Sequence, residues 1–308
     1  MKIAIDLGGT VIKVSSYLDN NPDPIWFETL DAHSNLGIEQ ALTRAEDIIR
    51  RHANGNPTCI GIASPGIVDS DRCLVTYING KFEDAVGFDF ASWCKQHFSC
   101  DLVMINDANA ALLGEVAYGC AVGYTNAVML IIGTGVGTSA MMDGKLVRGV
   151  HNQAGILGGH FIVNPFGRGC SCGAVGCLET YAGSREIIYQ AEADRNHKES
   201  AIFKERPITM KGIASCWEKG DEYATKIITT AIGYYSAAAV NLIHAYDPEC
   251  VILSGGLTGS KEIVKEIQKN VYFLAWLPWG QPDFRHAENP ERSVSLGLLK
   301  VMHEHEHT

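Results

Sequence analysis

Four side chains that could bind a metal ion lie between positions 160 and 177 of this sequence. His160, Cys170, Cys172 and Cys177 supply one imidazole and three thiolates, a full tetrahedral set for zinc. A closed set of four leaves no open coordination position, so we expect zinc to shape the loop and to take no part in a reaction. The alternative is a group of unrelated buried thiols, but four soft ligands among glycines favour the metal site.

Three glycine motifs follow apolar runs that are typical of buried strands. Glycines at such turns let backbone N–H groups approach and hold phosphate oxygens. Any one motif could simply close a hairpin, whereas the three together favour a bound nucleotide. They match neither the P-loop nor the dinucleotide-binding pattern. The motif residues are Gly8, Gly9 and Thr10; Gly133, Thr134, Gly135 and Gly137; and Gly255 and Gly256.

Two aspartates stand at the ends of predicted strands. Asp6 ends the first strand, and its carboxylate suits Mg²⁺, which accompanies nucleotide phosphates. Asp107 follows Asn106 where a strand pattern gives way to an Ala-rich helical pattern. The carboxylate of Asp107 could accept the proton of a substrate hydroxyl, or it could simply cap the helix.

The segments that must position these residues alternate between strand and helix patterns, which predicts an α/β fold. The first two glycine motifs, at 8–10 and 133–137, lie within predicted hairpins. Asp107 lies at a predicted strand-to-helix junction. We expect strands at 2–6, 11–17, 25–30, 59–63, 101–105 and 250–254, a hairpin over 126–142, and helices at 36–52, 89–97, 107–118, 221–246 and 294–302.

Length and composition limit the classes of protein that fit. A chain of 308 residues exceeds one ordinary core, so we expect a small lobe over 1–119, a large lobe with the zinc loop over 120–290, and a C-terminal helix and tail over 291–308 that return to the first lobe. A net charge of −10 opposes binding to nucleic acid. Because no signal peptide or membrane-spanning stretch is evident, we expect a cytoplasmic protein.

The sequence resembles the ROK family of sugar kinases and related repressors, nearly from end to end. The resemblance implies a two-lobed actin-like (hexokinase and ribonuclease H-like) ATPase fold with an interlobe cleft. It also implies ATP and Mg²⁺ as cofactors, a sugar as substrate, structural zinc and a homodimer. The motifs that carry it are DLGGT at 6–10, NDANAA at 106–111, IGTGVGTS at 132–139 and GGHFIVNPFGRGCSCGAVGCLETYA at 158–182.

The resemblance also implies a role for each site residue. Asp107 would be the general base for phosphorylation of a hexose or N-acylhexosamine at the 6-hydroxyl, and the glycine turns would clamp the phosphates. His160 would both ligate zinc and touch the sugar. The implied sugar contacts are Asn79, Asn106, His160 and Glu179.

The chain departs from the family pattern at Leu157. Many members read Glu-x-Gly-His where this sequence has Leu157-Gly158-Gly159-His160, so a carboxylate that binds sugar hydroxyls is missing. A lost charge-assisted hydrogen bond costs about 1.5–3 kcal/mol. The alternatives are a different sugar such as an N-acylhexosamine, a weak activity, a non-catalytic sugar sensor, or a register shift caused by the extra glycine. The family's repressors carry a helix-turn-helix domain before the first glycine turn, and we expect none here.

Overall fold

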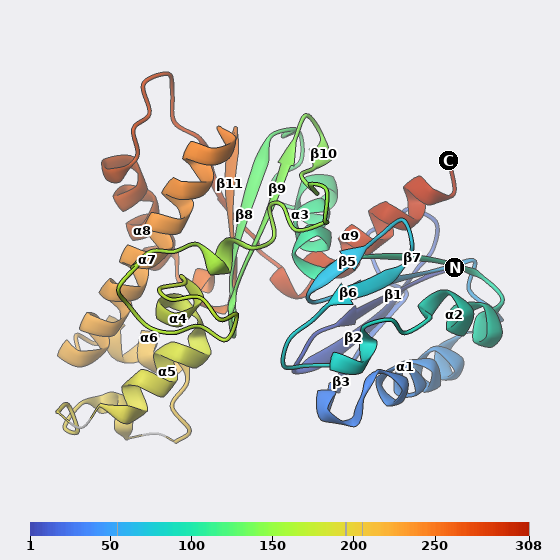
Figure 1. Ribbon diagram of the computed structural model, residues 1–308, viewed down its shortest axis with the longest axis horizontal. Helices are drawn as coiled ribbons and strands as arrows, with labels where there is room; N and C mark the ends of the chain where they lie inside the picture. Colours follow the sequence, from blue (N-terminus) through green and yellow to red (C-terminus); the bar gives the residue numbers. More distant parts are fainter. Residues whose placement is uncertain (54, 195, 205, 308) are drawn as a thin grey trace. The chain divides into compact units, whose positions relative to one another are not determined.

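The computed structural model describes residues 1–53, 55–194, 196–204 and 206–307, and the chain divides into two compact units (Figure 1). The first unit comprises Met1–Gly123, Arg148–Gln153 and Asn289–Thr308, and the second comprises Tyr124–Val147 and Ala154–Glu288. Each unit contains its own five-stranded sheet and its own hydrophobic core. Among the described residues, no helix has the length and apolar character needed to span a membrane.

The first unit contains a sheet in the order β3-β2-β1-β4-β7. Strands β1, β2 and β3 pair antiparallel, whereas β4 and β7 continue the sheet parallel to β1. Its elements are β1 (Lys2–Leu7), β2 (Val11–Tyr17), β3 (Trp26–Asp31), α1 (Ile38–His52), β4 (Cys59–Ser64), β5 (Ile67–Asp69), β6 (Leu74–Tyr77), α2 (Phe90–Phe98), β7 (Asp101–Asn106), α3 (Asp107–Tyr118) and α9 (Pro290–His305).

The second unit repeats this design with a sheet in the order β10-β9-β8-β11-β12. Here β8, β9 and β10 pair antiparallel, and β11 and β12 continue parallel to β8. Its elements are β8 (Ala127–Ile132), β9 (Val136–Met142), β10 (Lys145–Leu146), the 3-10 helix η3 (Gly158–His160), α4 (Glu179–Ala182), α5 (Ser184–Ala193), α6 (Met210–Glu218), α7 (Glu222–Tyr246), β11 (Cys250–Gly255), the 3-10 helix η5 (Gly256–Gly259), α8 (Lys261–Leu274) and β12 (Asp283–His286).

The α/β class and the principal elements predicted from the sequence are confirmed, with small shifts at their ends. The predicted helix over 107–118 has those bounds in the structure, and the one over 221–246 begins one residue later. The C-terminal helix extends beyond the predicted range at both ends, and it begins earlier because Pro290 fits its first turn, where no N–H donor is needed. Helices α5 and α6, which are short, were not predicted.

Two glycines bring helices α3 and α9 into close contact within the first unit. A Cβ atom at Gly297 would lie 1.8 Å from the carbonyl oxygen of Ala110, and one at Gly114 would lie 2.0 Å from that of Ser293. The buried carboxylate of Glu115 accepts a hydrogen bond from the Ser293 hydroxyl at the same contact. Helix α3, whose first residue is Asp107, is therefore held by backbone contacts that tolerate no side chain at these two positions.

We expect Gly297→Ala to lower the free energy of unfolding by roughly 2 kcal/mol or more, because the new methyl group would force the two helices apart. The matched control is Gly233→Ala on α7, where an added Cβ meets no atom within 4 Å. This control should be neutral or gain up to roughly 1 kcal/mol from better helix propensity. Denaturant unfolding of both variants tests the contact, and equal stabilities would contradict it.

Candidate active site

The register of the first sheet brings Asp6 and Asp107 to the same edge. Asp6 pairs with Ala63 on β4, and Ala63 pairs with Ile105 on β7. Because β1, β4 and β7 are parallel, their carboxyl ends meet at one edge, where ligands of α/β sheets commonly bind. Asp107, the first residue of α3, stands directly after the end of β7. The structure thus brings together two carboxylates that lie about a hundred residues apart in sequence.

Burial makes both carboxylates hold a proton more tightly than usual. Burial, and secondarily the nearby charge of Asp6, raise the pKa of Asp107 to about 7. Burial also raises the pKa of Asp6, and the Lys13 ammonium, 3.3 Å from the Asp6 carboxylate, acts in the opposite direction. A carboxyl group that titrates near neutral pH is well matched to proton transfer with a substrate hydroxyl.

Asn106 is the cap of helix α3, which removes the interpretation of Asp107 as a simple cap. The Asn106 side-chain oxygen accepts from the amide of Asn109, and its Nδ2 donates to the Gly66 carbonyl at 2.9 Å and to Asp107 Oδ1 at 3.0 Å. Asp107 Oδ1 also accepts from the Ala108 amide at 2.8 Å. One Asp107 oxygen is therefore fixed, whereas Oδ2 has no hydrogen-bond donor among the described residues and is open to a substrate.

The first glycine turn joins β1 to β2 and presents free amide groups. Within the described chain, the N–H groups of Gly8, Gly9 and Thr10 donate to no acceptor. A Cβ atom at Gly8 would lie 2.3 Å from the Val11 carbonyl oxygen, so this turn requires glycine there. One at Gly9 would lie 1.9 Å from Cδ and 2.4 Å from Nζ of Lys81, so this lysine lies across the turn.

Lys13 and Lys81 are site residues that the sequence analysis missed. Lys13 pairs with Asp6 across the β1–β2 hairpin, a contact that the period-2 alternation of this hairpin could have indicated. Lys81 is distant in sequence from the turn, and its only signal is that it comes two residues after Asn79. Asn79 itself is exposed after β6, in the segment that carries Lys81 to the turn.

The second glycine turn, in the second unit, has the same character. The N–H groups of Thr134 and Gly135 find no acceptor in the described part of the chain. The carbonyls of Gly133 and Thr134 accept from the first amides of α5, those of Ser184 and Arg185, each at 3.1 Å. The start of α5 therefore fixes the outer side of the turn and leaves its amides free for an anion.

The third glycine motif lies beside the second turn. Gly255 ends β11 opposite Ile132, has φ of 105°, and would place a Cβ atom 2.0 Å from the Ile132 carbonyl oxygen. Only glycine fits this position. Gly256 begins η5 with open space around it, and Gly137 lies within β9 opposite Ile131.

Glu179 contacts the second turn. Its carboxylate accepts the Val136 amide at 3.1 Å, and a Cβ atom at Gly135 would lie 2.2 Å from the same oxygen, Oε2. Glu179 therefore occupies one amide that would otherwise be available to an anion. The structure gives this predicted sugar contact a role in holding the turn.

The four predicted metal ligands converge in the second unit. The possible ligand atoms of His160, Cys170, Cys172 and Cys177 all lie within 4.8 Å of one another. Cys172 and Cys177 have their sulfurs 3.6 Å apart, and Cys170 Sγ lies 3.7 Å from His160 Nδ1. A tetrahedral zinc ion with sulfur bonds of about 2.3 Å would separate two sulfurs by about 3.8 Å. The donor set and its spacing fit such an ion.

Backbone constraints shape the loop before His160. A Cβ atom at Gly158 would lie 2.3 Å from Thr138 Cγ2, and one at Gly159 would lie 2.2 Å from the Val136 carbonyl oxygen. The Thr138 hydroxyl accepts from the Gly158 amide at 2.8 Å. Leu157 is 39% exposed just before this contact, so its side chain is not part of the packed core.

Comparison with known proteins gives a consistent set of similarities. The family model described as "ROK family" matches residues 2–304. A glucokinase from Halalkalibacterium halodurans is 27% identical over 281 residues, which cover 87% of this chain and 84% of the glucokinase. The xylose repressor of Bacillus subtilis is 27% identical over 218 residues, which cover 69% of this chain and 53% of the repressor.

Among solved structures, the ROK hexokinase from Thermus thermophilus superposes with a TM-score of 0.79. It is 26% identical, and the match covers 99% of both chains. ROK sugar kinases have the two-lobed actin-like ATPase fold, and this chain shares it. The similarities include enzymes and repressors, so they leave the choice between turnover and sensing to the site itself.

Asp107→Asn should stabilise the ligand-free protein at alkaline pH. The folded-state pKa of Asp107 lies above the ordinary value near 4. Ionisation of Asp107 therefore weakens the fold as the pH rises from about 4 to about 7. The gain should be roughly 2 kcal/mol at about pH 8, since partial solvent contact reduces the effect, and should vanish near pH 4. Thermal unfolding against pH measures it, with the exposed Asp71→Asn as control. A gain independent of pH would contradict the burial of the Asp107 charge.

Proposed function

The chain belongs to the ROK family, and we propose that it is an ATP-dependent kinase that phosphorylates a hexose or an N-acylhexosamine at the 6-hydroxyl. The observation that carries this proposal is the Asp107 carboxylate. One of its oxygens is fixed by Asn106 and Ala108, the other is open, and its pKa lies near 7. A protein that only binds a sugar has no need of a group poised to take a hydroxyl proton.

The reaction follows from the contacts of the site. Asp107 Oδ2 accepts the proton of the sugar hydroxyl as that oxygen bonds to the γ-phosphorus of ATP, and the bond to the β–γ bridging oxygen breaks to release ADP. The free amides at 8–10 and 134–135 would hold phosphate oxygens. Mg²⁺ bound with the nucleotide, with Asp6 as its protein ligand, would supply charge neutralisation. Lys81 would add a second cation beside the first turn.

The sugar contacts are proposed with different roles. Both Asn106 N–H donors are already used, so we infer that Asn106 acts chiefly by positioning Asp107. Asn79 is exposed and free to contact a sugar. His160 would contact the sugar while it also serves as one of the four metal ligands. Glu179 would need to share its carboxylate with the Val136 amide. The homodimer and the cytoplasmic location also remain predictions.

We also propose that His160, Cys170, Cys172 and Cys177 bind a structural zinc ion. The support is the match between the observed separations and tetrahedral geometry. Hydrogen bonds from the Cys170 amide to the Ala174 carbonyl and from the Gly176 amide to the Arg168 carbonyl already form the tight loop that presents the thiols. Zinc would thus fix the loop that carries His160.

The second candidate function is a sugar sensor without turnover. The observations that favour it are Leu157, which replaces the family's usual glutamate, and the similarity to a repressor. The open Asp107 oxygen and the two sets of free amides favour the kinase instead, because sensing alone requires neither.

Coupled-enzyme measurement of ADP release across N-acetylmannosamine, N-acetylglucosamine, glucose, mannose, fructose and allose tests the kinase. We expect turnover with at least one of these sugars, and a loss in kcat of about a hundredfold or more in Asp107→Asn, because general-base catalysis is worth at least that. If no sugar is turned over while sugars still raise the Tm, the sensor is correct.

The role of Lys81 is tested in the same assay by Lys81→Met, which removes the charge and shortens the unbranched side chain by one atom. We expect kcat to fall by about a hundredfold while KM for the sugar changes little, because the charge is needed mainly as phosphoryl transfer proceeds. Lys81→Arg should restore part of the loss. Lys95→Met, at an exposed position of α2, is the control. A wild-type kcat in Lys81→Met would contradict this role of Lys81.

Elemental analysis of the purified protein tests the metal site. We expect about one zinc ion per chain, lost in Cys172→Ser together with a lower Tm, because structural zinc contributes directly to folding. The Cys172 side chain is exposed, so the substitution by itself leaves no cavity. Cys216→Ser, outside the cluster, should retain zinc. A zinc content well below one per chain in the wild type would refute the site.

A further inference from the structure

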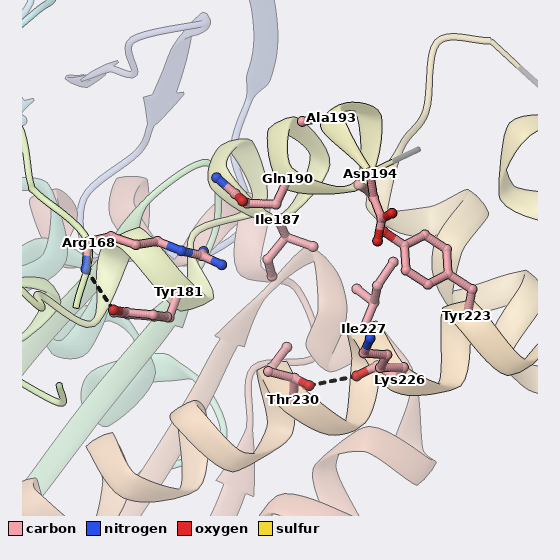
Figure 2. A pocket seen from close by; sticks show the side chains of 12 residues that line it. Arg168, Tyr181, Ile187, Gln190, Ala193, Asp194, Tyr223, Lys226, Ile227 and Thr230 are labelled. Carbon is pink, nitrogen blue, oxygen red and sulfur yellow. Dashed lines mark hydrogen bonds between the residues drawn. The ribbon is translucent and has the colours of Figure 1, made fainter. Parts of the chain in front are cut away.

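A cavity of about 390 Å³ lies in the second unit among α4, α5 and α7. Figure 2 shows the Arg168 side chain at one end of this cavity, with Asp194, Tyr223 and Lys226 toward the other. The two cations that line the cavity therefore lie apart and do not form a single binding site for an anion. A pair of cysteines in the first unit has a better-defined chemistry.

Cys94 and Cys100 place their sulfur atoms in contact. Both are free cysteines, and their Sγ atoms lie 3.5 Å apart. A disulfide bond requires a separation of about 2.05 Å, so the two sulfurs would need to approach by only about 1.5 Å. Among the described residues, three or more possible metal ligands come together only in the cluster that contains His160. The contact between these two thiols therefore favours a redox reaction over metal binding.

The turn between α2 and β7 holds the two thiols together. Cys94 lies on α2, and Ser99 follows the end of this helix with a left-handed backbone, φ 52°. The Ser99 amide donates to the Lys95 carbonyl at 3.1 Å, and the neighbouring Phe98 side chain is buried. The chain turns back at Ser99, so Cys100 lies beside Cys94 directly before β7 begins. The sulfur contact is thus fixed by the local backbone and by the core.

The two thiols have different surroundings. The Cys94 side chain is fully buried, whereas Cys100 is only partly buried and can meet a small solute. A hydrogen bond from the Cys94 thiol lowers the pKa of Cys100, although burial acts in the opposite direction. The same hydrogen bond, together with burial, raises the pKa of Cys94. Because the thiolate is the reactive form of cysteine, Cys100 would react first while Cys94 keeps its proton.

We propose that Cys94 and Cys100 are a modification site at which a hydroperoxide oxidises Cys100 and Cys94 then closes a disulfide. The Cys100 sulfur bonds to one peroxide oxygen, the O–O bond breaks, and the other oxygen leaves as an alcohol or as water. This step gives a sulfenic acid on Cys100. The Cys94 sulfur then bonds to the Cys100 sulfur, and the S–O bond breaks as the Cys94 proton leaves with the hydroxide as water. The two sulfurs are oxidised, and the hydroperoxide is reduced.

The disulfide would protect Cys100 without altering the candidate active site. A sulfenic acid that meets no second thiol is oxidised further to a sulfinic acid, which thiols do not reduce, whereas a disulfide is reversible. The bond would join α2 to the start of β7, and Asp107 follows the other end of this strand. At about 3.3 Å per residue, the two positions are roughly 20 Å apart along the strand. The modification site is therefore independent of the proposed kinase activity.

Peptide mapping of the full chain after treatment with hydrogen peroxide tests the site. Cleavage after Lys95 separates Cys94 from Cys100, so the disulfide would join two peptides that dithiothreitol then releases. Cys120 lies on the same peptide as Cys100, which makes Cys120→Ala the matched control, and this variant should form the linkage as the wild type does. Absence of the linkage from the peroxide-treated wild type would overturn the proposal.

Two variants separate the roles of the cysteines under the same treatment. Cys100→Ala should leave Cys94 as a free thiol, because Cys94 is buried. Cys94→Ala should accumulate at least about tenfold more sulfinic acid on Cys100 than the wild type does, because no thiol captures the sulfenic acid. Equal amounts of sulfinic acid in the two proteins would contradict the role of Cys94. The wild-type mapping decides the proposal even if Cys94→Ala disturbs α2, and it requires no turnover of any sugar.

Discussion

The arrangement of the first unit depends on one electrostatic constraint, the placement of the buried Asp6 and the half-buried Asp107 at one edge of a sheet. Loss of hydration raises the pKa of both carboxyl groups, and the charge of Asp6 raises that of Asp107 further. Lys13 offsets the charge of Asp6, and hydrogen bonds to one oxygen of Asp107 leave the other open. A cation in contact with Asp6 would lower both pKa values, and the Mg²⁺ of the proposed reaction would be such a cation.

In the proposed reaction, anions would be bound chiefly by backbone amides, and glycine makes that possible. Both hairpin turns keep amides without partners, and at Gly8 and Gly255 a side chain would collide with a carbonyl oxygen. The same property of glycine positions Asp107, the proposed base, because Gly114 and Gly297 let α9 lie directly against the helix that Asp107 begins. The same residue type would thus serve both the proposed binding of phosphate and the rigidity of the site.

Local features of the site could be predicted from the sequence, and long-range ones could not. The hairpin turns, the start of α3 and the metal ligands each depend on residues within about twenty positions, where spacing alone is informative. The contact of Lys81 with Gly9 and that of Glu179 with Val136 join segments whose approach depends on tertiary packing. Asn106 was predicted as a sugar contact, but only its partners show that its donors serve Asp107.

The departure at Leu157 bears on the sugar and not on the fold. The loop there is fixed by Gly158 and Gly159 against β9 and by the Thr138 hydroxyl, whereas the Leu157 side chain is exposed. A carboxylate at this position would contribute nothing to the packing of the loop, so its absence would remove the sugar contact that the family pattern implies without loosening the structure. Meanwhile the open Asp107 oxygen and the free amides are retained. The substitution therefore favours a change in which sugar is accepted over a loss of phosphoryl transfer.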